Sequence, residues 1–334
     1  MAETDAALAA LHDLLDDGLG LNPEYEDQLS SHLPMALDAL QELGADGARL
    51  REFRRRYGAR LSKLPPALPL GTLRPVAFGR IADYPAWLAY YRTALLDIGH
   101  DALLRRELPA LMQGCGGAAF HGLIRAGHAL RHGHQGELAA SLAYWASRHM
   151  PLAAEPGAPL PLGEWLAALC ALPDAGAMPL RPLIAQRMAD WGGREDWRVV
   201  AGRLAVEELP ALARSAAALY VHTADFTVLH MITASAALRQ NSPWMDAQAM
   251  RPFGAAAAAA LLSSGAARQA AAGPLPVASA SLDWDRLATL TLIQHNDHVI
   301  KLVAACRKMD RVDPAPAWRA AAARALGDTP QNSP

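Results

Sequence analysis

Cysteine and strand signals are both scarce in this sequence, and each shortage excludes a class of protein. The 334 residues include three cysteines, Cys115, Cys170 and Cys306, with no C-x-x-C spacing. This pattern argues against a disulfide framework and against a thiolate zinc site, and it favours a reducing cytoplasm as the compartment. No run of alternating β-branched residues and no Asn-Gly hairpin signal occurs, so a β-rich fold is not expected.

Long apolar runs and an excess of one charge are also missing. No stretch of about 18 uninterrupted apolar residues predicts a membrane span, and the N-terminus lacks the basic and apolar regions of a signal peptide. The 31 Lys and Arg nearly balance the 33 Asp and Glu, for a net charge of −2. This balance gives no broad attraction to nucleic acid or to an anionic membrane, so neither partner is expected.

Familiar catalytic motifs are absent as well. The sequence has no G-x-G-x-x-G after a predicted strand, no G-x-x-x-x-G-K-[ST] and no G-x-S-x-G. It therefore predicts no Rossmann unit, no P-loop and no serine-hydrolase elbow. Neither an HExxH nor a Glu-x-x-His pair is present, so no metal site can be assigned from spacing alone.

Helical patterning is what the sequence does contain. Segment after segment shows apolar residues at a period of 3.6, with capping residues at its ends, such as Asp225 before 226–239 and Asp283 within a last long helix at 281–309. We therefore predict an all-α protein: a multi-helix, bundle-like single domain over 1–334 with a buried histidine-lined site. Its core is expected at about 28–310, followed by a polar C-terminal tail at about 328–334.

One stretch, 114–146, gathers histidines and glycines. Three glycines, Gly114, Gly116 and Gly117, suit a tight backbone entry, and helical spacing begins at Ala118. The stretch holds four of the chain's twelve histidines. Two of them, His121 and His128, lie two turns apart and share one helix face.

Four histidines differ from the others in their apolar context. Each lies near the start of, or within, an apolar helical segment and is expected to point inward: His32, His121, His230 and His298. Buried imidazoles on separate helices are costly unless they share a polar partner. Neutral imidazole binds Fe, Zn, Cu and Ni, and helical bundles build such sites from facing helices. A shared metal is one interpretation, and separately satisfied core histidines are the other.

Several segments are distinctive in sequence and span most of the chain: SHLPMALDALQELGA, GCGGAAFHGLIRAGHAL with ELAASLAYWA, DFTVLHMITASAALR and DHVIKLVAACRK. In these segments and in their order, the chain resembles the questin oxidase-like family of anthraquinone-tailoring oxidases. The resemblance implies an all-helical, Baeyer–Villiger-type oxidoreductase, a mono- or dioxygenase. His32, His121, His230 and His298 fall on the family's motif positions. His128 departs from the pattern and is treated as peripheral.

This resemblance also implies a chemistry. Three or four imidazoles would hold a non-haem Fe(II) with an open position for O2, next to a small aromatic, polyketide-like (anthraquinone-like) substrate. NADPH would bind without a Rossmann unit or act through a partner reductase. Four aromatic residues, Trp87, Phe120, Tyr144 and Trp145, are candidates to line an apolar slot for this substrate. Ordinary core positions are the other interpretation of each, and the favoured one. The alternatives are a metal-dependent hydrolase or lyase with the same histidines, and a non-catalytic helical small-molecule-binding protein. Beyond the metal set, no catalytic residue is assigned.

Lys301 completes the set of candidate metal-site residues. It follows His298 by three positions (301 − 298), so both side chains lie on one helix face, in an apolar setting. Its ammonium either reaches water along the core surface or points at the metal. In the second case it has to lose its charge, for example by reaction with CO2 to a carbamate that binds the ion. Asp297 is expected to point away, about 100° around the helix.

Overall fold

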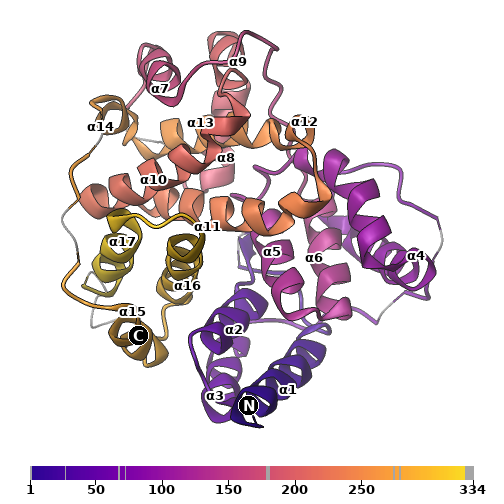
Figure 1. Ribbon diagram of the computed structural model, residues 1–334. Coiled ribbons are helices and arrows are strands. Elements are labelled where there is room, and N and C mark those ends of the chain that lie inside the picture. Colours follow the sequence, from indigo (N-terminus) through magenta and orange to yellow (C-terminus); the bar gives the residue numbers. More distant parts are fainter. Residues whose placement is uncertain are drawn as a thin grey trace.

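The computed structural model describes residues 2–26, 28–66, 68–71, 73–177, 181–273, 275–277 and 280–327 (Figure 1). Helices dominate these residues, which confirms the predicted all-α class. Two strands of two residues each, β1 (Glu24–Tyr25) and β2 (Leu29–Ser30), form a small antiparallel pair. The predicted polar tail at 328–334 lies outside the described residues.

The α-helices follow one another along the whole described chain. In the first part they are α1 (Ala2–Gly18), α2 (Leu33–Glu42), α3 (Gly47–Gly58), α4 (Tyr84–Met112), α5 (His121–His132), α6 (Gln135–Ser147), α7 (Leu162–Cys170) and α8 (Ile184–Gly192). In the second part they are α9 (Glu195–Ala201), α10 (Leu209–Thr223), α11 (Phe226–Asn241), α12 (Ala247–Met250), α13 (Pro252–Ser264), α14 (Ala267–Ala271), α15 (Trp284–Leu292), α16 (Asp297–Val312) and α17 (Pro316–Gly327).

Helix α11 lies at the centre of the molecule (Figure 1). It packs against α5, α10, α13 and α16, and α16 also contacts α2. One continuous apolar core joins these helices, and it includes Leu11 and Leu15 of α1 and Trp318 of α17. The core is therefore wider than the predicted 28–310. It grows at both ends because α1 and α17 each bury an apolar face.

The predicted last long helix is two helices. The chain leaves α15 after Leu292 and enters α16 at Asp297, and the Asn296 side chain accepts hydrogen bonds from the backbone N–H groups of His298 and Val299. Asn296 is thus an N-cap. The break matters for function, because it puts Asp297 and His298 in the first turn of a helix instead of its middle.

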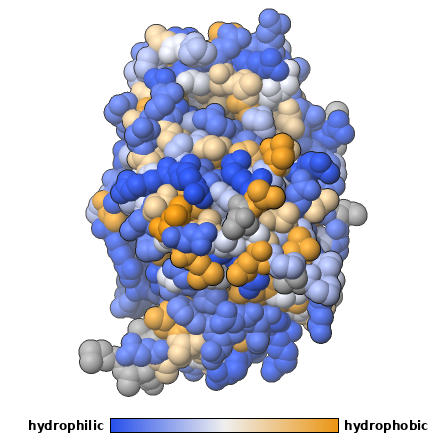
Figure 2. Space-filling view, turned by 90° about the vertical axis from the view of Figure 1, so that its right-hand side faces the viewer, coloured by the Kyte–Doolittle hydropathy of each residue, from blue (hydrophilic) through white to orange (hydrophobic). Residues whose placement is uncertain are grey.

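The surface carries scattered apolar side chains. Figure 2 faces the side that bears α4, and apolar patches lie there among mostly polar residues. The connector between α3 and α4 contributes exposed apolar residues, among them Leu70, Leu73 and Val76. No helix among the described residues is both long enough and apolar enough to span a membrane.

Candidate metal centre

The four histidines chosen by apolar context lie together in the structure. They come from four separate places, the N-cap of α2, the first residue of α5, the second turn of α11 and the first turn of α16. The centroid of the His32 imidazole lies 4.6 Å from the centroid of His121 and 4.5 Å from the centroid of His298. His230 closes the ring, at 5.1 Å from His121 and 5.3 Å from His298. Three of the four are buried, and His298 is partly exposed.

The chain enters α5 through an unusual turn. Ala118, Ala119 and Phe120 have φ values of 47°, 54° and 68°, three successive left-handed residues without a glycine among them. Left-handed backbone costs about 1–2 kcal/mol per L-residue. The predicted helical start at Ala118 is therefore wrong, and α5 begins at His121. The turn brings the Ala118 carbonyl to His121 Nδ1, which donates a hydrogen bond to it.

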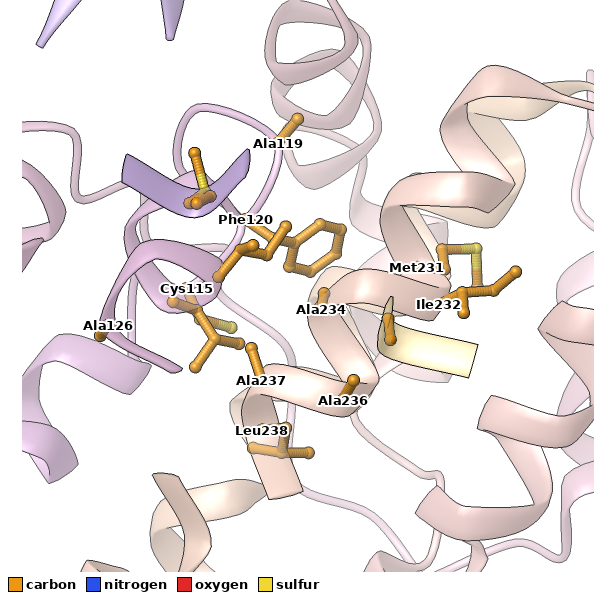
Figure 3. Packing of buried hydrophobic residues seen from close by; sticks show 14 of the residues in the cluster. Cys115, Ala119, Phe120, Ala126, Met231, Ile232, Ala234, Ala236, Ala237 and Leu238 are labelled. Carbon is orange, nitrogen blue, oxygen red and sulfur yellow. The ribbon is translucent and has the colours of Figure 1, made fainter. Parts of the chain in front are cut away.

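Two glycines of α5 allow its neighbours to approach closely. A Cβ at Gly122 would lie 2.6 Å from Trp145 Cβ of α6, and one at Gly127 would lie 3.0 Å from Ala237 Cα of α11. Figure 3 shows the Phe120 ring beside Ala234 of α11, among the small buried side chains of this region. Small side chains on both helices thus bring His121 next to His230.

Three of the four imidazoles have their Nδ1 atoms occupied. His32 Nδ1 donates to the Asp297 carboxylate, and His230 Nδ1 donates to the Phe226 carbonyl at 2.7 Å. His121 Nδ1 donates to Ala118, as described above. A neutral imidazole carries one N–H, so these bonds leave the Nε2 atoms as bare acceptors. Histidine ligands of metals show this arrangement, with the second ring nitrogen held by a carboxylate or a carbonyl.

The bare Nε2 atoms of His32 and His121 face each other at 2.6 Å. Two lone pairs at this distance repel each other unless a proton or a cation lies between or beside them. Burial lowers the pKa of both imidazoles, well below the usual value for His121, so a shared proton is disfavoured. The donor set therefore fits a metal ion that prefers nitrogen ligands.

Asp297 holds the only carboxylate in this cluster among the described residues. Its ligand atom and those of His32 and His298 all lie within 4.8 Å of one another. Burial opposes its ionisation, but the neighbouring His32 and His298 hold the pKa of its carboxyl below the usual range. The prediction that Asp297 points away from the site is wrong, because α16 begins at this residue and its carboxylate turns back toward His32.

Lys301 lies one turn beyond His298 and is 1% exposed. The Lys301 side chain is therefore almost wholly enclosed, as expected more for a lysine that points into the protein than for one that extends along the surface. Burial lowers the pKa of the ammonium to about 8, against an opposing effect of Asp297. Its positive charge in turn lowers the pKa of His32, His121, His230 and His298.

A pocket of about 530 Å³ opens onto the cluster. Its lining includes the four histidines, the left-handed turn, the β1–β2 hairpin, residues 148–150, and the start of α8 with Phe226. Its volume is that of a typical small-molecule site. The four aromatic candidates have the core positions that the sequence favoured, since all are buried and none lines this pocket: Trp87, Phe120, Tyr144 and Trp145. The Tyr144 hydroxyl lies 2.6 Å from Ser30 Oγ, and Ser30 lines the pocket.

Sequence reasoning missed two residues of the site. Asp297 was visible only as the neighbour of His298, and its role depends on a helix boundary that Asn296 could have signalled. Arg187 lines the pocket from α8, and nothing in its sequence context distinguishes it. His128, treated as peripheral, is outside the cluster and lies 2.6 Å from Asp38 instead.

Comparison with known proteins adds no family assignment. No protein-family model matches the chain, and no curated protein matches it.

Proposed function

We propose that this protein is an oxygen-using oxidoreductase that holds a non-haem iron with His32, His121, His230 and His298 and oxidises or cleaves a ring of an aromatic, polyketide-like substrate. The observation that carries the proposal is the pair of bare Nε2 atoms, 2.6 Å apart, whose rings are fixed from behind by Asp297 and by a backbone carbonyl. The resemblance to questin oxidase-like proteins supplies the reaction class. The unpaired cysteines of the chain fit a cytoplasmic setting.

The chain's own residues have distinct tasks in this proposal. The four imidazoles bind the ion in their neutral form, which burial favours; the pKa of His230, for example, is lowered to about 3. Asp297 orients His32 and adds one negative charge near the site. The pocket would hold the aromatic substrate beside the histidines, and the apolar wall of the pocket would keep water away from the substrate. When bound, ferrous iron supplies O2 activation.

Lys301 is proposed to complete the site. A cationic ammonium beside a divalent ion is unfavourable, and burial already brings the pKa of this amine to about 8. Its neutral form can react with CO2 to give a carbamate. The carbamate removes the cation and provides the anionic oxygen ligand that four histidines lack.

The electron balance separates two versions of the reaction. If both atoms of O2 enter the substrate, no external reductant is needed. If one atom is inserted and the other leaves as water, two electrons and two protons are required. NADPH would supply both electrons and one proton, and the second proton would come from solvent. Because the sequence has no Rossmann fingerprint, a partner reductase is the expected route for NADPH.

Metal analysis of the purified protein tests the proposal. It is followed by anaerobic optical and EPR spectra of the ferrous protein, before and after O2 is admitted. Iron that changes its spectrum with O2 supports the oxidoreductase. Zinc alone would support the hydrolase or lyase, and a metal-free protein that cannot be loaded would leave a small-molecule-binding protein.

The role of Lys301 is tested by substitution. Lys301→Ala is expected to lower the iron content sharply, and Lys301→Arg is expected not to restore it, because a guanidinium cannot form a carbamate. Full iron occupancy and a wild-type O2 response in Lys301→Ala would remove Lys301 from the site.

A further inference from the structure

The pocket wall contains two arginines with different surroundings. Arg148 is fully engaged, since its Nε and Nη2 atoms both donate to the Glu24 carboxylate. Arg187, on α8, forms no such pair. Among the residues that the structure describes, its one hydrogen-bond acceptor is the Ser263 carbonyl, 3.3 Å from Nη1. A guanidinium carries five N–H donors, so Arg187 retains most of its capacity.

The Nε atom of Arg187 is enclosed and has no acceptor among the described residues. An unpaired buried donor costs about 1–3 kcal/mol. The charge of Asp225 raises the pKa of Arg187, but the carboxylate of Asp225 already accepts the N–H groups of Thr227 and Val228 as the cap of α11. Burial lowers the pKa of the Arg187 guanidinium, as expected for a charge without a full partner.

The remaining pocket wall near Arg187 is mostly apolar. It includes Leu183, Ile184 and Phe226. The pocket is therefore apolar along its wall, nitrogen-rich at the histidine cluster, and cationic at one point. A ligand that satisfies all three regions is an aromatic or similarly flat apolar body that carries an anionic group away from the metal centre.

We propose that Arg187 is the carboxylate-binding residue of this pocket and that the natural substrate is an aromatic carboxylate. A carboxylate matches the planar fork of arginine and accepts two N–H groups side by side. The inference rests on the proposed function only in assuming that the pocket is the substrate site. Arg148 cannot bind the substrate carboxylate in this way, because its Nε and Nη2 atoms already donate to the Glu24 carboxylate.

Binding of a matched pair of probes tests the inference. 2-Naphthoate and 2-naphthamide have nearly the same size and differ in charge, and their dissociation constants are measured by fluorescence on the protein as purified and again after chelator treatment. The chelated sample excludes direct binding of the carboxylate to the metal. Wild type is expected to prefer naphthoate. Arg187→Met is expected to weaken naphthoate binding by about tenfold or more, and to leave naphthamide binding unchanged.

Two further variants act as controls. Arg187→Lys keeps the charge and is expected to retain part of the preference. Arg181→Met removes an exposed arginine just before α8 that pairs with Asp190 outside the pocket, and it is expected to bind both probes like wild type. The inference is overturned if wild type shows no preference for naphthoate, or if Arg187→Met binds naphthoate normally or loses both probes equally.

Failure of this inference and failure of the proposed function are separate outcomes. A protein that contains and binds no metal, but whose preference for naphthoate depends on Arg187, would contradict the proposed oxidoreductase and support the carboxylate site. An iron-containing protein that responds to O2, but that shows no preference between the two probes in wild type or in Arg187→Met, would support the oxidoreductase and contradict the carboxylate site.

Discussion

Helix α5 carries a buried histidine, His121, and a partly buried one, His128, seven residues apart (128 − 121), and their surroundings differ in kind. His128 meets the Asp38 carboxylate, which also accepts hydrogen bonds from Arg131. Each group there has an opposite charge or a donor to match it. His121 meets another imidazole through bare nitrogens and borders a pocket. The first site is complete with protein atoms alone, and the second is not.

This difference distinguishes a structural polar cluster from a binding site. Both lie on one helix, and both bury a histidine near an aspartate. Burial and composition alone therefore do not identify a metal centre. The criterion is whether donors and acceptors balance. At Asp38 they do, and at the four histidines the acceptors are in excess, although the charge of Lys301 acts on them.

The largest expected effect is on the stability of the fold, through the cluster of Asp38, His128 and Arg131. Asp38→Ala leaves Arg131 and His128 without their shared, fully buried carboxylate, and we expect a loss of about 3 kcal/mol in the free energy of unfolding. Iron content per folded molecule should stay at the wild-type level. Urea unfolding with parallel metal analysis checks both. A variant that stays stable but loses iron would break the comparison.

The next effect is on metal affinity at the second site. His121→Ala removes a proposed ligand, and we expect iron affinity to fall by more than about 100-fold, beyond the range of outer-sphere changes. Stability of the metal-free protein should change little, because one of two repelling acceptors is gone. His128→Ala on the same helix is the matched control and should bind iron normally. Equal iron loss in the two variants would contradict the assignment.

A smaller effect is expected from the residue behind the proposed ligand. Asp297→Asn keeps the size of the side chain but removes the charge that orients His32. Orienting partners of metal ligands typically contribute about 10–100-fold to affinity, and the same drop is expected here. Competition with a chelator of known affinity measures it. Iron binding indistinguishable from wild type would reduce Asp297 to a structural partner.

The smallest effect concerns acid. The pKa of Asp38 is held below its usual value, mainly by His128 and Arg131 acting against burial. A depressed carboxyl pKa stabilises the fold above the unfolded pKa of about 3.9, and this contribution is lost as pH falls below it. Between pH 6 and pH 3 the expected loss from Asp38 is on the order of 1 kcal/mol. Asp38→Asn should show a correspondingly shallower acid dependence in urea unfolding, and an unchanged slope would refute this role.

Sequence reasoning worked where the signal was local. Apolar spacing and caps such as Asp225 and Asp283 fixed the helical class, and both aspartates cap α11 and α15 as predicted. The four histidines could be selected because an imidazole on an apolar helix face has few ways to be satisfied. That these four side chains converge could be predicted without any distance information, from the requirement that they share a polar partner.

The features that escaped prediction depend on long-range packing. The left-handed turn at 118–120 is held by surrounding contacts against its local preference, so alanine spacing pointed to a helix there. Asp297 belongs to the site because α16 begins at that residue and docks on α2. Arg187 reaches the pocket from a helix with no histidine at all. None of these follows from a window of neighbouring residues.

The hydrogen bond between His32 and Asp297 joins residues 265 positions apart, and this sets an order of events during synthesis. His32 leaves the ribosome early, with α2 and α5, whereas its orienting partner and Lys301 arrive with α16. Until α16 is made, the early histidines have no complete site. In the proposed function, metal loading would therefore follow the synthesis of α16, and a bound ion would join residues 265 positions apart.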